Sequence, residues 1–266
     1  MSSAGLPEDM ALETRLRERR AAGAKLLVPY VTAGLTEDWT RVVEAVAAAG
    51  ADAIEIGIPF SDPIMDGPVI QAASQTALDR GATPASVLAE LGEVSIDTPL
   101  VAMTYCNLLF HAGYERFAGW LQSAGVSGTI FPDLPMEEAG PWAELAAGKG
   151  MANVLLAAPT TGQERARAIA AESRGFVYGV GLMGVTGVRD QLATSAIGVA
   201  ERLKSVTDRP VLIGVGISSP AQAREIAPHA DGVVVGSALV KILAEGGGPE
   251  GAYAFVASLR RALDGQ

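Results

Sequence analysis

Short apolar segments alternate with helical segments along the whole of this 266-residue chain. Each of eight apolar segments with strand character is followed by a segment in which apolar residues recur at helical spacing. Strict alternation of strands and helices is typical of a parallel sheet, and eight such units without a break in composition favour a closed (β/α)8 barrel of the TIM type. The expected strands are residues 26–34, 53–58, 98–107, 126–135, 152–159, 175–181, 209–218 and 230–240.

An open, doubly wound sheet is the alternative for a chain with this alternation. Such sheets usually have about five or six strands and a glycine-rich first turn. The first turn here, TAGLTED at 32–38, contains no GxGxxG pattern. We therefore predict a single α/β barrel domain over residues 1–266, with an extra amphipathic helix at 6–22 that covers the bottom of the barrel.

Glu55 stands in the middle of the second expected strand, AIEIGI at 53–58. Side chains alternate along a strand, so the isoleucines at 54, 56 and 58 point to one side and Glu55 points to the other. If the isoleucines pack under the helices, Glu55 faces the interior of the barrel. A carboxylate there is costly unless it has a partner or a chemical role, which favours a functional role for Glu55.

The loop after this strand carries two further acids, Asp62 and Asp66, among several prolines and glycines. Either acid could serve as an ordinary turn or helix-capping residue. The active sites of such barrels lie at the C-terminal ends of the strands, which is where Glu55 and this loop are expected. We therefore predict that Glu55 and Asp66 approach one pocket from a strand and from its loop.

Glycine-rich segments end the last two expected strands. Residues 214–218, GVGIS, follow the seventh strand, and Gly236 and Ser237 follow the eighth and open a helix. Backbone N–H groups at a helix start can bind an anion, and the corresponding loops form a phosphate site in many barrels. Glycine also serves merely to turn the chain, so each segment alone is weak evidence. The glycine-rich loop at 183–189 suits a lid or an ordinary connection.

The composition limits the classes of partner and cofactor. A net charge of −10 argues against nucleic acid and anionic membranes as partners. A single cysteine, Cys106, fits a reducing compartment. The two histidines form no cluster with metal-ligand spacing, but a metal site made of carboxylates alone is still compatible with the sequence. No segment reaches the roughly 18 apolar residues of a membrane span, and the first 20 residues lack the order of a secretory signal. We expect a cytoplasmic protein.

Several motifs resemble the family of tryptophan synthase α subunits over nearly the whole chain. The segment ADAIEIGIPFSDPIMDGPVIQ at 51–71 is the most specific of them in combination with the others. These are VPYVTAG (28–34), YCNLLF (105–110), PDLPMEE (132–138), GVTG (184–187), GVGISSP (214–220) and GSALVKI (236–242).

The resemblance implies a lyase that cleaves indole-3-glycerol phosphate, in the retro-aldol sense, to indole and glyceraldehyde 3-phosphate. Glu55 matches the family's catalytic general acid, and Asp66 matches the aspartate that accepts the indole N–H. Thr186 would link a closing lid to Asp66. The implied phosphate positions are Gly187, Gly216, Gly236 and Ser237, and the implied indole pocket contains Tyr30, Ile70, Tyr105 and Tyr178, although any one of the tyrosines could instead serve core packing.

The family also implies a partner, a pyridoxal-phosphate-dependent β subunit in an α2β2 assembly, while the α chain itself carries no cofactor. Asp62 and Asp133 match the docking surface. Gly181 and Val235 depart from the family pattern, in which many relatives have a serine at the first position and some have one at the second. A stand-alone indole-releasing lyase and a non-catalytic barrel that binds a phosphorylated ligand are the competing interpretations.

Overall fold

Eight parallel strands close into a barrel in the order β1 to β8 in the computed structural model, which describes residues 10–181, 189–214 and 216–265. The closed barrel predicted from the alternation is confirmed, and the open sheet is excluded. The strands are β1 (Leu26–Thr32), β2 (Ile54–Gly57), β3 (Leu100–Met103), β4 (Val126–Ile130), β5 (Ala152–Ala157), β6 (Val177–Val180), β7 (Val211–Gly214) and β8 (Gly232–Val235).

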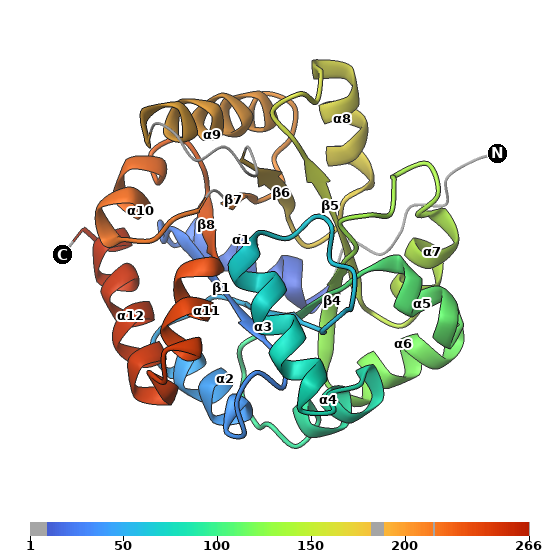
Figure 1. Ribbon diagram of the computed structural model, residues 1–266. Helices are drawn as coiled ribbons and strands as arrows, with labels where there is room; N and C mark the ends of the chain where they lie inside the picture. Colours follow the sequence, from blue (N-terminus) through green and yellow to red (C-terminus); the bar gives the residue numbers. More distant parts are fainter. Residues whose placement is uncertain (1–9, 182–188, 215, 266) are drawn as a thin grey trace.

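A ring of helices surrounds the strands (Figure 1), as expected where crossover helices connect parallel neighbours. Within the described residues, no helix has the length and apolar character needed to cross a membrane. The helices are α1 (Ala11–Ala21), α2 (Trp39–Ala48), α3 (Pro68–Asp79), α4 (Pro84–Leu91), α5 (Cys106–Ala112), α6 (Tyr114–Ser123), α7 (Gly140–Gly148), α8 (Gln163–Glu172), α9 (Arg189–Lys204), α10 (Pro220–Ile226), α11 (Ser237–Ala244) and α12 (Gly248–Leu263).

The two faces of β2 belong to two different apolar cores. Ile54, Ile56 and Ile58 are buried in the core between the strands and the outer helices. Ala53 is buried in the smaller core inside the barrel, together with residues such as Val28 from β1. Glu55 alternates with the isoleucines and therefore faces the barrel interior, as its position in the sequence predicts.

Helix α1 closes the barrel at the N-terminal ends of the strands, which confirms the predicted role of the extra helix, although the helix begins at Ala11, after Met10 in an extended conformation. Leu12 packs closely against two glycines. A Cβ atom on Gly128 would lie 2.9 Å from Leu12 Cδ2, and a Cβ atom on Gly175 would lie 2.7 Å from it. Glu13 accepts the Gly175 N–H at 3.0 Å and pairs with Arg209 at 2.8 Å. In Figure 1, α1 lies behind the strands, on the side opposite the β2–α3 loop.

The strand predicted at 98–107 is too long, because β3 ends at Met103 and helix α5 begins at Cys106. The Cys106 N–H, which has no partner within the helix, donates to Asp133 Oδ1 at 2.9 Å. A carboxylate that follows a different strand therefore stabilises the start of α5.

Candidate active site

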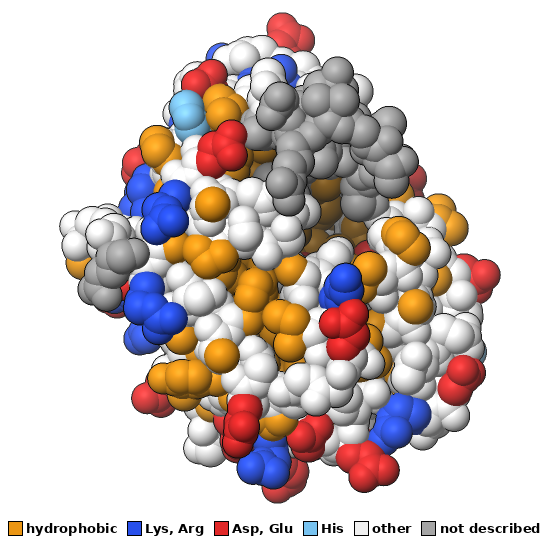
Figure 2. Space-filling model, turned by 60° about the vertical axis from the view of Figure 1, so that its left-hand side comes forward, with side chains coloured by type: hydrophobic (Ala, Val, Ile, Leu, Met, Phe, Trp, Pro, Cys, Tyr) orange, Lys and Arg blue, Asp and Glu red, His pale blue; other side chains and the backbone are white. Residues whose placement is uncertain are grey.

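A cavity of about 690 Å³ opens at the C-terminal ends of the strands. Tyr30, Glu55, Asp66 and Tyr178 all line it, so the two acids predicted to share a pocket do share one. Figure 2 shows a hollow with apolar side chains at its floor, beside the grey residues. Ile70, Gly216, Gly236 and Ser237 are further predicted site residues on the cavity wall.

Glu55 comes from β2 and is almost wholly buried, with 1% of its surface exposed. It stands level with Tyr30 on one neighbouring strand and with Val101 on the other. Its Oε1 atom has no hydrogen-bond partner among the described residues. Burial, assisted by the negative charge of Asp66, raises the pKa of Glu55 to about 8. The side chain is therefore mostly protonated at neutral pH.

Asp66 is held in the β2–α3 loop by bonds to its backbone and to its side chain. Its N–H donates to the Pro63 carbonyl at 3.0 Å, and its own carbonyl accepts Gln71 Nε2 at 3.0 Å. The Tyr105 hydroxyl donates to Asp66 Oδ2 at 3.1 Å. Burial raises the pKa of Asp66 to about 6, while the hydrogen bond from Tyr105 opposes that rise. Asp66 is therefore mostly charged at neutral pH.

Two tyrosines of the cavity wall lie over glycines of the neighbouring strands. The Tyr30 hydroxyl occupies the space in which a Cβ of Gly57 would stand, and the Tyr178 ring lies in the same way against Gly214. In both cases the glycine is paired with the residue two positions beyond the tyrosine, so each ring leans diagonally across the sheet toward the cavity mouth. Burial raises the pKa of both phenols, which keeps them neutral.

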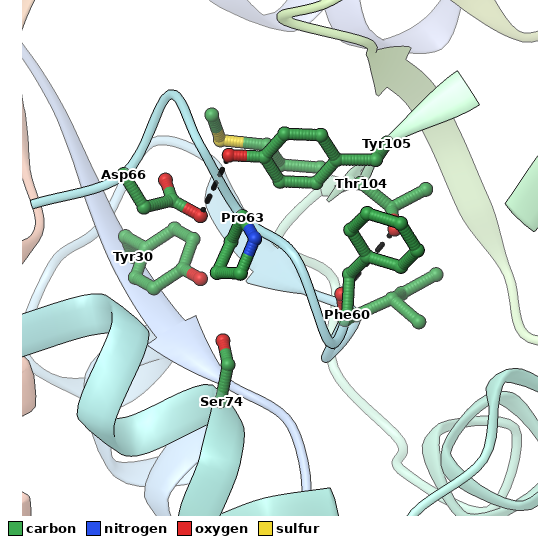
Figure 3. Close-up of a pocket in the computed structure, with 9 residues that line it drawn as sticks. Tyr30, Phe60, Pro63, Asp66, Ser74, Thr104 and Tyr105 are labelled. Carbon is green, nitrogen blue, oxygen red and sulfur yellow. Dashed lines mark hydrogen bonds between the residues drawn. The ribbon is translucent and has the colours of Figure 1, made fainter. Parts of the chain in front are cut away.

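Tyr105 was predicted to line the indole pocket, but its side chain is not on the wall of the large cavity. It lies behind Asp66, where its ring stacks on Phe60 with the ring centroids 5.1 Å apart. Figure 3 shows the hydroxyl pointing to Asp66 from that side. Tyr105 therefore contacts the Asp66 carboxylate and does not line the large cavity.

Helix α11 begins at the cavity, with Gly236 before its first turn and Ser237 at its first position. The N-terminal end of a helix is electrically positive and presents free N–H groups, which suits an anion. Gly216 lines the same region with a φ of 54°, a conformation that glycine adopts without strain. The predicted phosphate residue Gly187 and the predicted lid residue Thr186 lie outside the described residues.

The two departures from the family pattern differ in location. Gly181 lines the cavity, whereas Val235 is buried in the core and is absent from the cavity wall. The first departure therefore adjoins the space in which a ligand would sit, and the second does not.

The two acids predicted at a docking surface are not brought together. Asp62 is exposed in the β2–α3 loop and accepts a hydrogen bond from the Ser61 hydroxyl at 2.6 Å. Asp133 lies on the cavity rim and accepts both the N–H and the thiol of Cys106, at 2.9 and 3.0 Å. Burial, with the Asp133 charge, raises the pKa of the Cys106 thiol to about 11, so the thiol stays protonated.

Three apolar wall residues, Met103, Phe131 and Leu156, were not singled out from the sequence. They come from β3, from the residue after β4, and from β5, and only the closed barrel shows that they share one cavity. No group of three or more His, Cys, Asp or Glu side chains within the described ranges could hold a metal ion.

The site combines a protonated carboxyl group, a charged carboxylate and an anion-binding helix start around one cavity. The carboxyl group can donate a proton to a ligand. The carboxylate can stabilise a positive charge that develops beside it. This arrangement suits acid catalysis on a ligand that is apolar at one end and anionic at the other.

The sequence profile of the family described as "Tryptophan synthase alpha chain" matches residues 16–261. A tryptophan synthase alpha chain from Halorhodospira halophila is 45% identical over 259 residues, which cover 94% of this chain and 95% of the relative. One from Picosynechococcus is 42% identical over 261 residues, 95% of this chain and 99% of the relative. Among solved structures, Mycobacterium tuberculosis tryptophan synthase superposes with a TM-score of 0.88 at 38% identity, covering 96% and 99% of the two chains.

Proposed function

Because this chain belongs to the tryptophan synthase alpha chain family, we propose that Glu55 and Asp66 carry out the lyase reaction at the mouth of its barrel. The reaction cleaves indole-3-glycerol phosphate to indole and glyceraldehyde 3-phosphate, as a step of tryptophan biosynthesis. The observation that carries the assignment is that Glu55 and Asp66 face one cavity in opposite protonation states.

Glu55 is the general acid of this proposal. Its carboxyl group protonates the indole ring carbon that bears the glycerol chain, which places a positive charge on the ring. The hydroxyl on the first carbon of the glycerol chain then gives its proton to the Glu55 carboxylate, which regenerates the acid. The bond between this carbon and the ring breaks, and its electron pair returns to the ring. Burial supports this role, because it keeps Glu55 protonated at neutral pH.

Asp66 is the group that stabilises the charged ring. Protonation of the ring carbon increases the positive charge at the ring nitrogen, and a carboxylate that accepts its N–H binds this species more tightly than the substrate. The pKa of about 6 supports the role, because Asp66 stays mostly charged while Glu55 stays mostly protonated.

The substrate would lie with its ring between the two acids and its phosphate at α11. Ile70, Tyr30 and Tyr178 supply apolar wall for the ring. Gly236 joins the two ends of the site, because a Cβ there would lie 3.6 Å from Tyr30 and 3.7 Å from Ile70. Gly216 and Ser237 complete the proposed phosphate contacts within the described residues, and the sequence adds Gly187 and Thr186.

We also propose the β subunit of tryptophan synthase as the partner, in an α2β2 assembly in which the partner holds the pyridoxal phosphate. The matched relatives are named as alpha chains, which favours a subunit over a stand-alone lyase. Asp62 and Ile64 suit a docking surface, because both are exposed on the β2–α3 loop and Ile64 has 80% of its surface exposed. A single cysteine supports a reducing cytoplasm as the location.

Indole release from indole-3-glycerol phosphate tests the proposal, with and without an added β subunit. We expect slow release by the isolated chain, acceleration by the β subunit, and loss of at least about a hundredfold in Glu55→Gln and Asp66→Asn. Asp79→Asn is the matched control, because Asp79 ends α3 at an exposed position away from the cavity. Indole release by Asp66→Asn at the wild-type rate would exclude the role assigned to Asp66.

A further inference from the structure

A second, much smaller chamber lies behind Asp66, on the side away from the large cavity. Its volume is about 10 Å³, and its polar lining comes from Tyr30, Asp66, Ser74, Thr104 and Tyr105. Figure 3 shows the hydroxyl groups of Tyr30 and Ser74 directed into the space below Asp66. Tyr30 and Asp66 line both spaces, so they form part of the wall between them.

Ser74 supplies a hydroxyl group to the wall of this chamber. It lies on α3 with only 4% of its surface exposed, and it makes no side-chain hydrogen bond to another described residue. Thr76, two positions further along the same helix, donates to the Ala72 carbonyl at 2.9 Å. Thr104, also on the chamber wall, donates to the Ile58 carbonyl at 3.3 Å. The Ser74 oxygen is not one of the fully buried side-chain atoms that lack a partner, so a water molecule in the chamber can reach it.

We propose that this chamber binds one water molecule, which links the Ser74 hydroxyl to the Asp66 carboxylate and the Tyr30 hydroxyl. A volume of about 10 Å³ is near the minimum that holds a single water. Buried waters typically make about three hydrogen bonds to protein groups, and these three side chains provide that number. Ser74 is then a positioning residue, because it acts on Asp66 through the bound water.

The water would give Asp66 a second hydrogen-bond donor on the side away from the substrate. Tyr105 already donates to Oδ2, and the water would donate from the chamber, so both bonds stabilise the charged carboxylate. The chamber would therefore hold Asp66 in place and keep it charged in the pH range of the reaction. This inference rests on the role proposed for Asp66.

A crystal structure at a resolution that shows ordered water tests the site directly. We expect one density peak in the chamber, about 2.7–3.2 Å from Ser74 Oγ, from the Asp66 carboxylate and from the Tyr30 hydroxyl. A chamber without density overturns the proposal, as does a Ser74 hydroxyl bonded to its own helix. The density is independent of turnover, so a chain that failed to cleave indole-3-glycerol phosphate would contradict the proposed function alone.

Ser74→Val and Ser74→Thr test the effect on Asp66. They have nearly the same shape, and only the threonine keeps a hydroxyl group. Ser74→Val should move the acidic limb of the kcat/KM profile to higher pH by about half a unit, because the carboxylate loses a donor, while Ser74→Thr keeps the wild-type limb. Equal profiles for the two variants overturn the positioning role. A ¹³C NMR titration of Asp66 gives the same comparison without turnover.

Discussion

The Tyr105 hydroxyl joins the backbone of the β2–α3 loop to the side chain of Asp66. It accepts the Met65 N–H at 2.9 Å and donates to Asp66 Oδ2 at 3.1 Å. The loop is otherwise open to solvent, with Ile64 80% exposed and Met65 39% exposed. The Tyr105 ring is in turn stacked on Phe60. The Tyr105 side chain therefore fixes the position of Asp66, which lies on an exposed loop.

Tyr105→Phe should lower kcat/KM by about tenfold with little change in global stability, because the ring stays stacked while the hydrogen bond to Asp66 is lost. The acidic limb of the pH profile should also move upward, because the lost bond had stabilised the charged carboxylate. Steady-state kinetics across pH measure both effects. Tyr253→Phe is the control, since Tyr253 lies on α12 with 48% of its surface exposed. Equal kinetics in the two variants would refute the positioning role.

The activity should follow a bell-shaped pH profile between the pKa values of the two acids. Asp66 must be charged, so activity is lost as pH falls through about 6, and Glu55 must be protonated, so activity is lost as pH rises through about 8. The optimum of kcat/KM therefore lies near pH 7. A profile that keeps rising from pH 7 to pH 9 would show that Glu55 does not act as an acid.

Glu55 should make the protein less stable as the pH rises. Its pKa is raised from 4.5 to about 8 on folding, so the folded state favours the protonated form. The associated stability is complete below about pH 4.5 and is lost as the pH rises toward 8. Glu55→Gln should be inactive yet lose less stability than the wild type between pH 6 and pH 8.5. Urea unfolding at both pH values measures the difference, and parallel losses in the two proteins would contradict the prediction.

The barrel and the direction of Glu55 were predictable because both depend on local periodicity. Three isoleucines at alternate positions pack in the outer core, and their spacing alone predicts which way the intervening Glu55 points. The start of α5 was not predictable in this way. It depends on Asp133, which follows a different strand and reaches Cys106 only in the closed barrel.

The same difference between local and long-range determinants applies to the residues of the site. Asp66 could be placed near Glu55 because a loop must leave the end of its own strand. The location of Tyr105 behind Asp66, rather than on the cavity wall, depends on how two separate loops pack against each other. Ser74 gave no signal at all, since a serine on a helix reads the same whether it faces solvent or a chamber.

Gly57→Ala should destabilise the protein by about 1–3 kcal/mol and lower activity, because the new methyl group would overlap the Tyr30 hydroxyl. Tyr30 would have to leave its place on the cavity wall. Adding Tyr30→Leu should restore part of the stability but not the activity, so a double-mutant cycle measures the coupling. Gly119→Ala is the control, because its Cβ would meet nothing within 4 Å, and its helical site predicts equal or greater stability. If the losses of stability from Gly57→Ala and Tyr30→Leu were additive, the overlap between the new methyl group and the Tyr30 hydroxyl would be excluded.

Asp52→Asn should lower the free energy of unfolding by about 3 kcal/mol while leaving kcat unchanged, because the buried Asp52 carboxylate ties three elements together at the closed end of the barrel. It accepts the Leu27 N–H of β1 at 2.8 Å, Arg19 of α1 at 2.7 Å and Arg260 of α12 at 3.1 Å. An amide keeps the shape but removes the negative charge that both guanidinium groups share, although Arg260 keeps Asp264 as a second partner at 2.6 Å. Asp208→Asn is the matched control: its carboxylate also pairs with two arginines of α1, Arg17 and Arg20, but it is 89% exposed, so its loss should change stability little. Denaturant unfolding and indole release on the same preparations separate the two effects, and equal stability of the two variants would show that α1 is not held through Asp52.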